Sequence, residues 1–120
     1  MQDVSTYSKN THPDDPGINA QTHVHEFLGS TQIDILHNHR FAGVTSEAIP
    51  LKGGGHIHGI FTNTDFTRNH LHELAVETGP AIPVGKGRHV HLVKASTTVD
   101  LDHFHNTVFA TLIDDPIAEY

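Results

Sequence analysis

The chain has 120 residues and a mass of 13.2 kDa, which fits one small domain. Its net charge of −7 argues against nucleic acid or an anionic membrane surface as the main partner, since both require a basic face. The absence of cysteine excludes disulfides, thiolate metal sites and a cysteine nucleophile. We find no apolar run that would span a membrane and no secretory signal, so we expect a cytoplasmic protein.

The first twenty residues are polar and contain two prolines, so 1–20 is predicted to be an N-terminal polar arm. The remainder, 21–120, is predicted to be a single β domain built from three repeats. This prediction depends on the histidines that follow the arm.

Twelve of the 13 histidines form His-x-His pairs, and these pairs recur with a fixed spacing. Two pairs are offset by 14 residues, and the couple then recurs after 33 residues, which defines units near 22–54, 55–87 and 88–120. Threonines and prolines follow the same register, at Thr31/Thr64/Thr97, Thr45/Thr78/Thr111 and Pro50/Pro83/Pro116. The pairs are His23/His25, His37/His39, His56/His58, His70/His72, His89/His91 and His103/His105.

The sequence around each pair is typical of a β-strand, where residues i and i+2 project from the same face. We expect each unit to be a β-hairpin, and the turn-rich GSTQ stretch places its turn at Thr31. Phe27 would then face Ile35, and Ile60 would face Arg68, which breaks the apolar pattern. Three hairpins closed around a pseudo-threefold axis would give a six-stranded antiparallel barrel or a prism-like fold.

The histidine face also carries large apolar residues, so we expect it to be the interior: Phe27, Phe41, Leu74, Val93, Leu101 and Phe109. The opposite face is also partly apolar. We expect it to be covered by the loops around the three prolines or by another subunit in a homo-oligomer.

The segments THVHEFLGST, HNHRFAGVTSEAI, GHIHGIFT and GRHVHLVKASTT resemble the bacterial YmaF-like family over nearly all of 21–120. The resemblance implies no particular chemistry, because the family is functionally uncharacterised. His-x-His pairs are also similar to those of cupins. A cupin has one pair followed by a glutamate, whereas this chain has six pairs without that glutamate, so cupin catalysis is not transferred.

Clustered imidazoles favour a transition-metal site, and all twelve paired histidines are candidate ligands. Copper(II), zinc, iron(II) and nickel all suit imidazole, whereas calcium and magnesium prefer oxygen. One arrangement gives three four-histidine sites, one in each hairpin. The other gives a shared multinuclear centre in two layers, with His23, His39, His56, His72, His89 and His105 in one and His25, His37, His58, His70, His91 and His103 in the other. Either way, we expect three ions per chain or a multiple of three.

Carboxylates and threonines near the pairs are candidates to orient the rings, although each is also explained as a solvated or turn residue. The candidates are Glu26, Asp34, Glu73, Asp100, Asp102, Thr31, Thr64 and Thr97.

Three functions are compatible with this pattern. The first is a histidine-rich metal-binding protein for storage, buffering or delivery, which the threefold repetition of identical ligands favours. The second is an oxidoreductase-type metalloenzyme, which would require an open coordination position. The third is a pH-responsive structural module, because twelve imidazoles would become charged together near pH 6.

Overall fold

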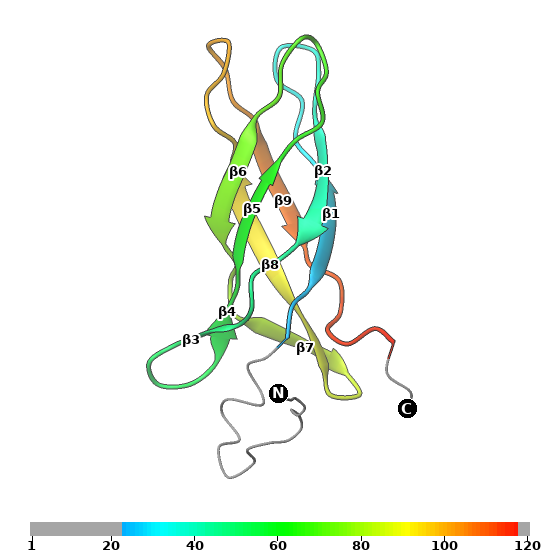
Figure 1. Cartoon of the computed structure of the whole chain (residues 1–120), viewed down its shortest axis with the longest axis vertical. Helices are drawn as coiled ribbons and strands as arrows, with labels where there is room; N and C mark the ends of the chain where they lie inside the picture. Colours follow the sequence, from blue (N-terminus) through cyan, green and yellow to red (C-terminus); the bar gives the residue numbers. More distant parts are fainter. Residues whose placement is uncertain (1–22, 118–120) are drawn as a thin grey trace, which may run out of the picture.

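The computed structural model describes residues 23–117 and contains nine β-strands and no helix in that range (Figure 1). The all-β prediction is therefore confirmed. No helix in this part of the chain could span a membrane. The predicted arm, 1–20, lies outside the described residues. The strands are β1 (Glu26–Ser30), β2 (Arg40–Val44), β3 (Ile49–Pro50), β4 (His56–Ile57), β5 (Gly59–Asn63), β6 (Glu73–Glu77), β7 (Ala81–Gly85), β8 (Arg88–Ser96) and β9 (Asn106–Ala110).

Three antiparallel hairpins make up the body of the structure: β1 with β2, β5 with β6, and the second half of β8 with β9. Equivalent ladder positions are 33 residues apart. The first ladder pairs of the three hairpins are Glu26 with Val44, Gly59 with Glu77, and Leu92 with Ala110.

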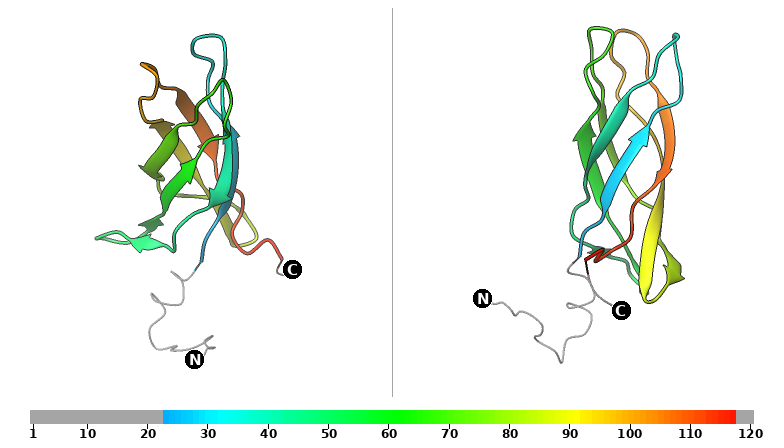
Figure 2. Two further views of the ribbon diagram at one scale, coloured as in Figure 1. Left: turned by 45° about the horizontal axis from the view of Figure 1, so that its top comes forward. Right: turned by 90° about the vertical axis from the view of Figure 1, so that its right-hand side faces the viewer.

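The hairpins lie side by side around a common interior, as both views in Figure 2 show. Strand β2 lies against β5, β6 against β8, and β9 against β1. Two isolated main-chain hydrogen bonds join each pair of neighbouring hairpins, for example from Asp65 N to Arg40 O at 2.8 Å and from Ser46 N to Gly59 O at 2.9 Å. The β-ladders do not continue from one hairpin to the next, so the described strands form small separate sheets. The predicted closed six-stranded barrel is therefore wrong.

An apolar core fills the middle of the interior and consists of Phe27, Phe41, Ile60, Leu74, Val93 and Phe109. Two glycines leave room for its aromatic rings. A Cβ atom on Gly43 would lie 2.8 Å from Phe27 Cζ, and one on Gly29 would lie 2.7 Å from Phe41 Cζ. The interior face predicted from the sequence is correct except for Leu101, which is 66% exposed.

The predicted hairpin register is wrong. The first turn lies at Ile35 and Leu36, whose φ angles are 51° and 64°, and Phe27 pairs with Gly43. These left-handed turn positions usually hold Asn or Gly, so two large apolar residues gave no turn signal. The same shift puts Arg68 in the second turn, which explains why it interrupts the apolar pattern.

This register separates the two His-x-His pairs of each hairpin. The pair that precedes the first strand lies at the open end of the hairpin, and the pair that precedes the second strand lies next to the turn. The apolar core therefore lies between two histidine-lined ends.

The outer surface does not have the predicted cover. Pro50 and Pro83 belong to β3 and β7, which form small extensions at the open end of the hairpins. On the hairpins themselves, Leu28 and Phe61 remain 63% and 74% exposed. The proline loops therefore leave this apolar surface open, and cover by another subunit stays a prediction.

Candidate metal centres

The twelve paired histidines form two separate clusters. The first pair of every unit meets at the open end, which we call the open-end cluster: His23, His25, His56, His58, His89 and His91. The second pairs meet below the turns, which we call the turn-end cluster: His37, His39, His70, His72, His103 and His105. Both predicted arrangements therefore group the wrong histidines together, because each assumed a hairpin turn at Thr31.

The open-end cluster brings all six side chains within reach of one ion, since their ligand atoms lie within 4.8 Å of one another. The Nε2 atoms of His23, His56 and His89 form a nearly equilateral triangle with sides of 3.1, 3.2 and 3.2 Å. His25 Nε2 lies 3.1 Å from His89 Nε2 on the deeper side of this triangle.

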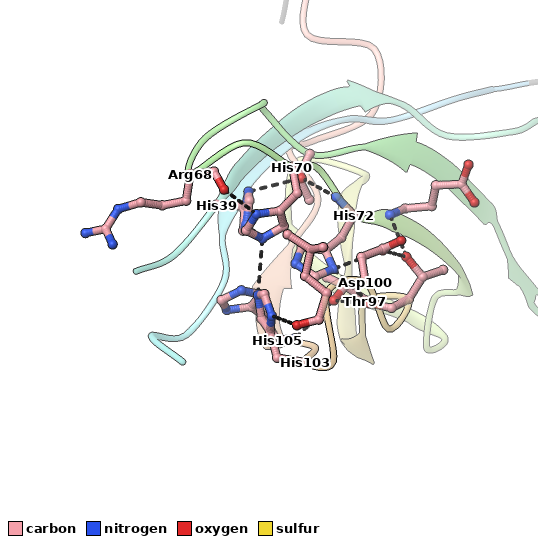
Figure 3. Close-up of polar contacts among 12 residues, drawn as sticks. His39, Arg68, His70, His72, Thr97, Asp100, His103 and His105 are labelled. Atoms are coloured by element: carbon pink, nitrogen blue, oxygen red, sulfur yellow. Dashed lines mark hydrogen bonds and ion pairs between the residues drawn. The ribbon is translucent and has the colours of Figure 1, made fainter. Parts of the chain in front are cut away.

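The turn-end cluster also has short contacts between ring nitrogens, and Figure 3 labels its rings of His39, His70, His72, His103 and His105. His70 Nε2 lies 3.1 Å from the Nε2 atoms of His39 and His103 and 3.3 Å from that of His37. Five of the six side chains satisfy the same 4.8 Å limit. The sixth, His72, lies beside them, with ring centroids 4.8 Å from those of both His39 and His70.

The outward-facing nitrogens are held by main-chain carbonyls. In the open-end cluster the Nδ1 atoms of His25, His58 and His91 lie 2.8–2.9 Å from the carbonyl oxygens of Leu112, Ser46 and Gly79. All six Nδ1 atoms of the turn-end cluster likewise lie 2.8–3.1 Å from carbonyl oxygens. A carbonyl only accepts, so each of these Nδ1 atoms carries the proton and donates it.

This tautomer leaves the Nε2 atoms as lone-pair acceptors that face each other. Between two rings of this tautomer a short Nε2–Nε2 distance is not a hydrogen bond, because no proton lies between the nitrogens; this holds for the contacts of His70 with His37, His39 and His103. Four buried Nε2 atoms have no hydrogen-bond partner at all: His58, His72, His91 and His105. Buried acceptors without partners are costly, and a bound cation would satisfy them.

Six buried threonines fix the main chain at the innermost histidine of each pair. Thr31, Thr64 and Thr97 accept hydrogen bonds from the main-chain nitrogens of the turn-end cluster at 2.9–3.0 Å. The open-end cluster uses Thr45, Thr78 and Thr111 in the same way, at 3.0–3.1 Å. The first three were predicted candidates. The other three were missed as site residues, although their 33-residue spacing was the signal that could have found them.

Of the predicted orienting carboxylates, Asp100 lies beside a clustered imidazole, with Oδ2 3.2 Å from His72 Nδ1. Sequence reasoning missed two others: Asp65 Oδ1 is 3.2 Å from His39 Nδ1, and Asp114 Oδ1 is 3.3 Å from His89 Nδ1. The remaining candidates have no ring contact. Asp34 bridges to the main chain of its turn, and Glu26, Glu73 and Asp102 are exposed.

The clusters favour neutral imidazoles. Burial, with the charges of neighbouring rings adding to it, lowers the pKa of His23, His25 and His89 from 6.5 to about 4. Burial is also the largest cause that lowers the pKa of His39, His56, His58, His72, His91 and His105. Neutral imidazole is the form that binds a metal ion.

Together, the small antiparallel sheets and the buried histidine clusters define a class: an all-β, histidine-rich protein whose side chains are compatible with metal binding. The family model described as YmaF, spore germination protein GerY/YamF, matches residues 20–113, so the chain belongs to the YmaF family. Searches of curated proteins and of solved structures found no match.

Proposed function

We propose that the protein binds two transition-metal ions, one in the open-end cluster and one in the turn-end cluster, for storage, buffering or delivery. The observation that carries this proposal is that two buried Nε2 atoms in each cluster have no hydrogen-bond partner, those of His58 and His91 at the open end and those of His72 and His105 at the turn end. A divalent cation turns their mutual repulsion into coordination bonds. All twelve paired histidines act as ligands in this proposal.

Each cluster has room for one ion, because all six side chains of the open-end cluster and five of the turn-end cluster place a ring nitrogen within 4.8 Å of the others. The two ions are well separated. His25 and Thr31 mark the open end and the turn end of the same strand, and six residues at about 3.3 Å each span about 20 Å. We therefore propose two single-ion sites, in place of the three sites or the multinuclear centre that the sequence favoured.

The same arrangement supports one domain, 21–120, whose three units close around a pseudo-threefold axis. Every unit contributes one His-x-His pair to each cluster, so a bound ion would link all three hairpins at both ends. This role supports binding over catalysis, because ligands that surround an ion leave no position for a substrate.

Native mass spectrometry of untagged protein loaded with metal tests the proposal. Two ions per chain are expected. The double variants His56→Ala/His58→Ala and His70→Ala/His72→Ala form a matched pair, because both remove one His-x-His pair of the second unit, at opposite ends. Each is expected to lower the stoichiometry from two ions to one. Binding of no metal by the wild-type protein would contradict the proposal.

A further inference from the structure

We infer that each cluster is an octahedral shell of six imidazoles, which suits a six-coordinate divalent ion of the iron(II) or nickel(II) class better than four-coordinate zinc. The inference rests on the proposed function and narrows it to the kind of ion bound. It follows from how the six rings of each cluster are arranged around its centre.

In the open-end cluster, every ring stands edge-on beside four rings and opposite the fifth. Neighbouring centroids are 4.5–5.1 Å apart, with interplanar angles of 67–90°. Six points with this relationship are the vertices of an octahedron. The opposite pairs, which make no ring contact, are His23 with His91, His25 with His56, and His58 with His89.

The turn-end cluster has the same arrangement, with neighbouring centroids 4.7–5.1 Å apart and interplanar angles of 71–88°. Its opposite pairs are His37 with His72, His39 with His103, and His70 with His105. His72 therefore occupies the sixth vertex. Two clusters formed from different strand ends thus have the same octahedral form.

The dimensions suit a six-coordinate transition-metal ion. Octahedron edges of 3.1–3.2 Å, as measured between Nε2 atoms of the open-end cluster, place the centre about 2.2 Å from each nitrogen, slightly longer than the bonds of four-coordinate zinc. A single ion at the centre reaches all six lone pairs at once.

A tetrahedral ion fits less well. Zinc in closed sites takes four ligands, so two of the six imidazoles would keep buried lone pairs without a partner.

Oxygen-preferring ions are excluded by the ligand type. Calcium and magnesium bind carboxylate and carbonyl oxygens, and the inner face of each cluster presents only imidazole nitrogen. The nearby carboxylates of Asp65, Asp100 and Asp114 contact Nδ1 atoms, on the outer side of the rings. There they can balance the charge of a divalent ion without binding it.

Cobalt(II) titration of the metal-free, untagged full chain tests the geometry, because six-coordinate cobalt(II) absorbs visible light weakly and tetrahedral cobalt(II) absorbs it intensely. We expect two equivalents to bind with weak bands only. In competition, we expect nickel(II) to be retained over equimolar zinc by on the order of tenfold or more.

The outcomes separate the two proposals. Intense tetrahedral bands, or displacement of nickel by equimolar zinc, would overturn the octahedral inference and leave metal binding intact. Failure of cobalt and nickel to bind would overturn both. The variant His58→Ala/His89→Ala provides a check within the same molecule, because it removes one opposite pair from the open-end cluster. Its turn-end cluster should still bind one cobalt ion with weak bands.

Discussion

The Nε2 atoms of His39 and His70 lie 3.1 Å apart, although the ring proton of each lies on Nδ1, on the other side of the ring. The Nδ1 proton of His39 is donated to Asp65 O, and that of His70 to Arg68 O. The fold therefore holds facing lone pairs beside its apolar core, and this has measurable consequences for stability.

Removal of metal should destabilise the fold. An ion that binds only the folded state at a thousandfold excess over its Kd contributes about 4 kcal/mol. Each kcal/mol shifts the melting temperature of a domain of this size by about 4–8 °C. We expect a chelator at neutral pH to lower the melting temperature by more than about 15 °C, as followed by calorimetry, and re-addition of metal to restore it. Equal melting temperatures with and without metal would refute this coupling.

Metal-free protein should lose stability in acid. The folded-state pKa values of His23, His25 and His89 are lowered to about 4 from 6.5, so only the unfolded chain takes up these protons at first. Stability is therefore complete above pH 6.5 and is lost progressively as pH falls to about 4. Urea unfolding at pH 7, 6, 5 and 4 measures this. A midpoint that does not change between pH 7 and pH 4 would contradict the prediction.

Replacing a buried threonine that accepts a main-chain hydrogen bond should lower the free energy of unfolding, even when the side-chain volume is kept. Thr78→Val leaves the main-chain nitrogen of His58 without its 3.1 Å acceptor, at a cost of about 1–3 kcal/mol. Thr62→Val is the matched control, because the Thr62 hydroxyl lies in a solvent-exposed hydrogen bond. We expect denaturant unfolding to show a clear loss for Thr78→Val and a change within about 0.5 kcal/mol for Thr62→Val. Equal effects would show that the threonine hydroxyl is not needed.

Replacing the two residues of the first turn, Ile35 and Leu36, should stabilise the fold. Ile35 and Leu36 have positive φ angles, which cost L-residues about 1–2 kcal/mol each. Ile35→Asn/Leu36→Gly supplies the residues that such turns favour, so we expect a gain of about 1 kcal/mol in the free energy of unfolding. Ile33→Asn is the control, because Ile33 is also exposed but has no positive φ. A loss of stability in the turn variant would show that the apolar turn residues have a packing role.

A methyl group at Gly43 should disrupt the core. Its Cβ would lie 2.8 Å from Phe27 Cζ, and such overpacking costs about 1–3 kcal/mol. At Gly59 a Cβ would meet Ser46 Oγ at 3.4 Å, an ordinary contact, so Gly59→Ala serves as the control. Thermal unfolding should separate the two variants. If Gly43→Ala has the same melting temperature as the wild type, the Phe27 ring must be able to move aside.

The candidate ligands could be read from the sequence, because their pairing depends on local spacing. Histidines at i and i+2 share one face of a strand, and a 33-residue period shows that three units repeat the same pairs. The buried aromatic residues followed from the same alternation, and Phe27, Phe41 and Phe109 all lie in the core.

The grouping of those ligands depended on the tertiary structure. Moving the turn from Thr31 to Ile35 and Leu36 separates the pairs of one hairpin and brings together the equivalent pairs of three. Local propensity could not locate this turn, because it places apolar residues in left-handed positions that the packing of the hairpins must stabilise. The octahedral arrangement arises only when rings from residues 33 and 66 positions apart meet. The sequence by itself therefore determined which side chains face inward, and the packing of the hairpins decided how many clusters they form.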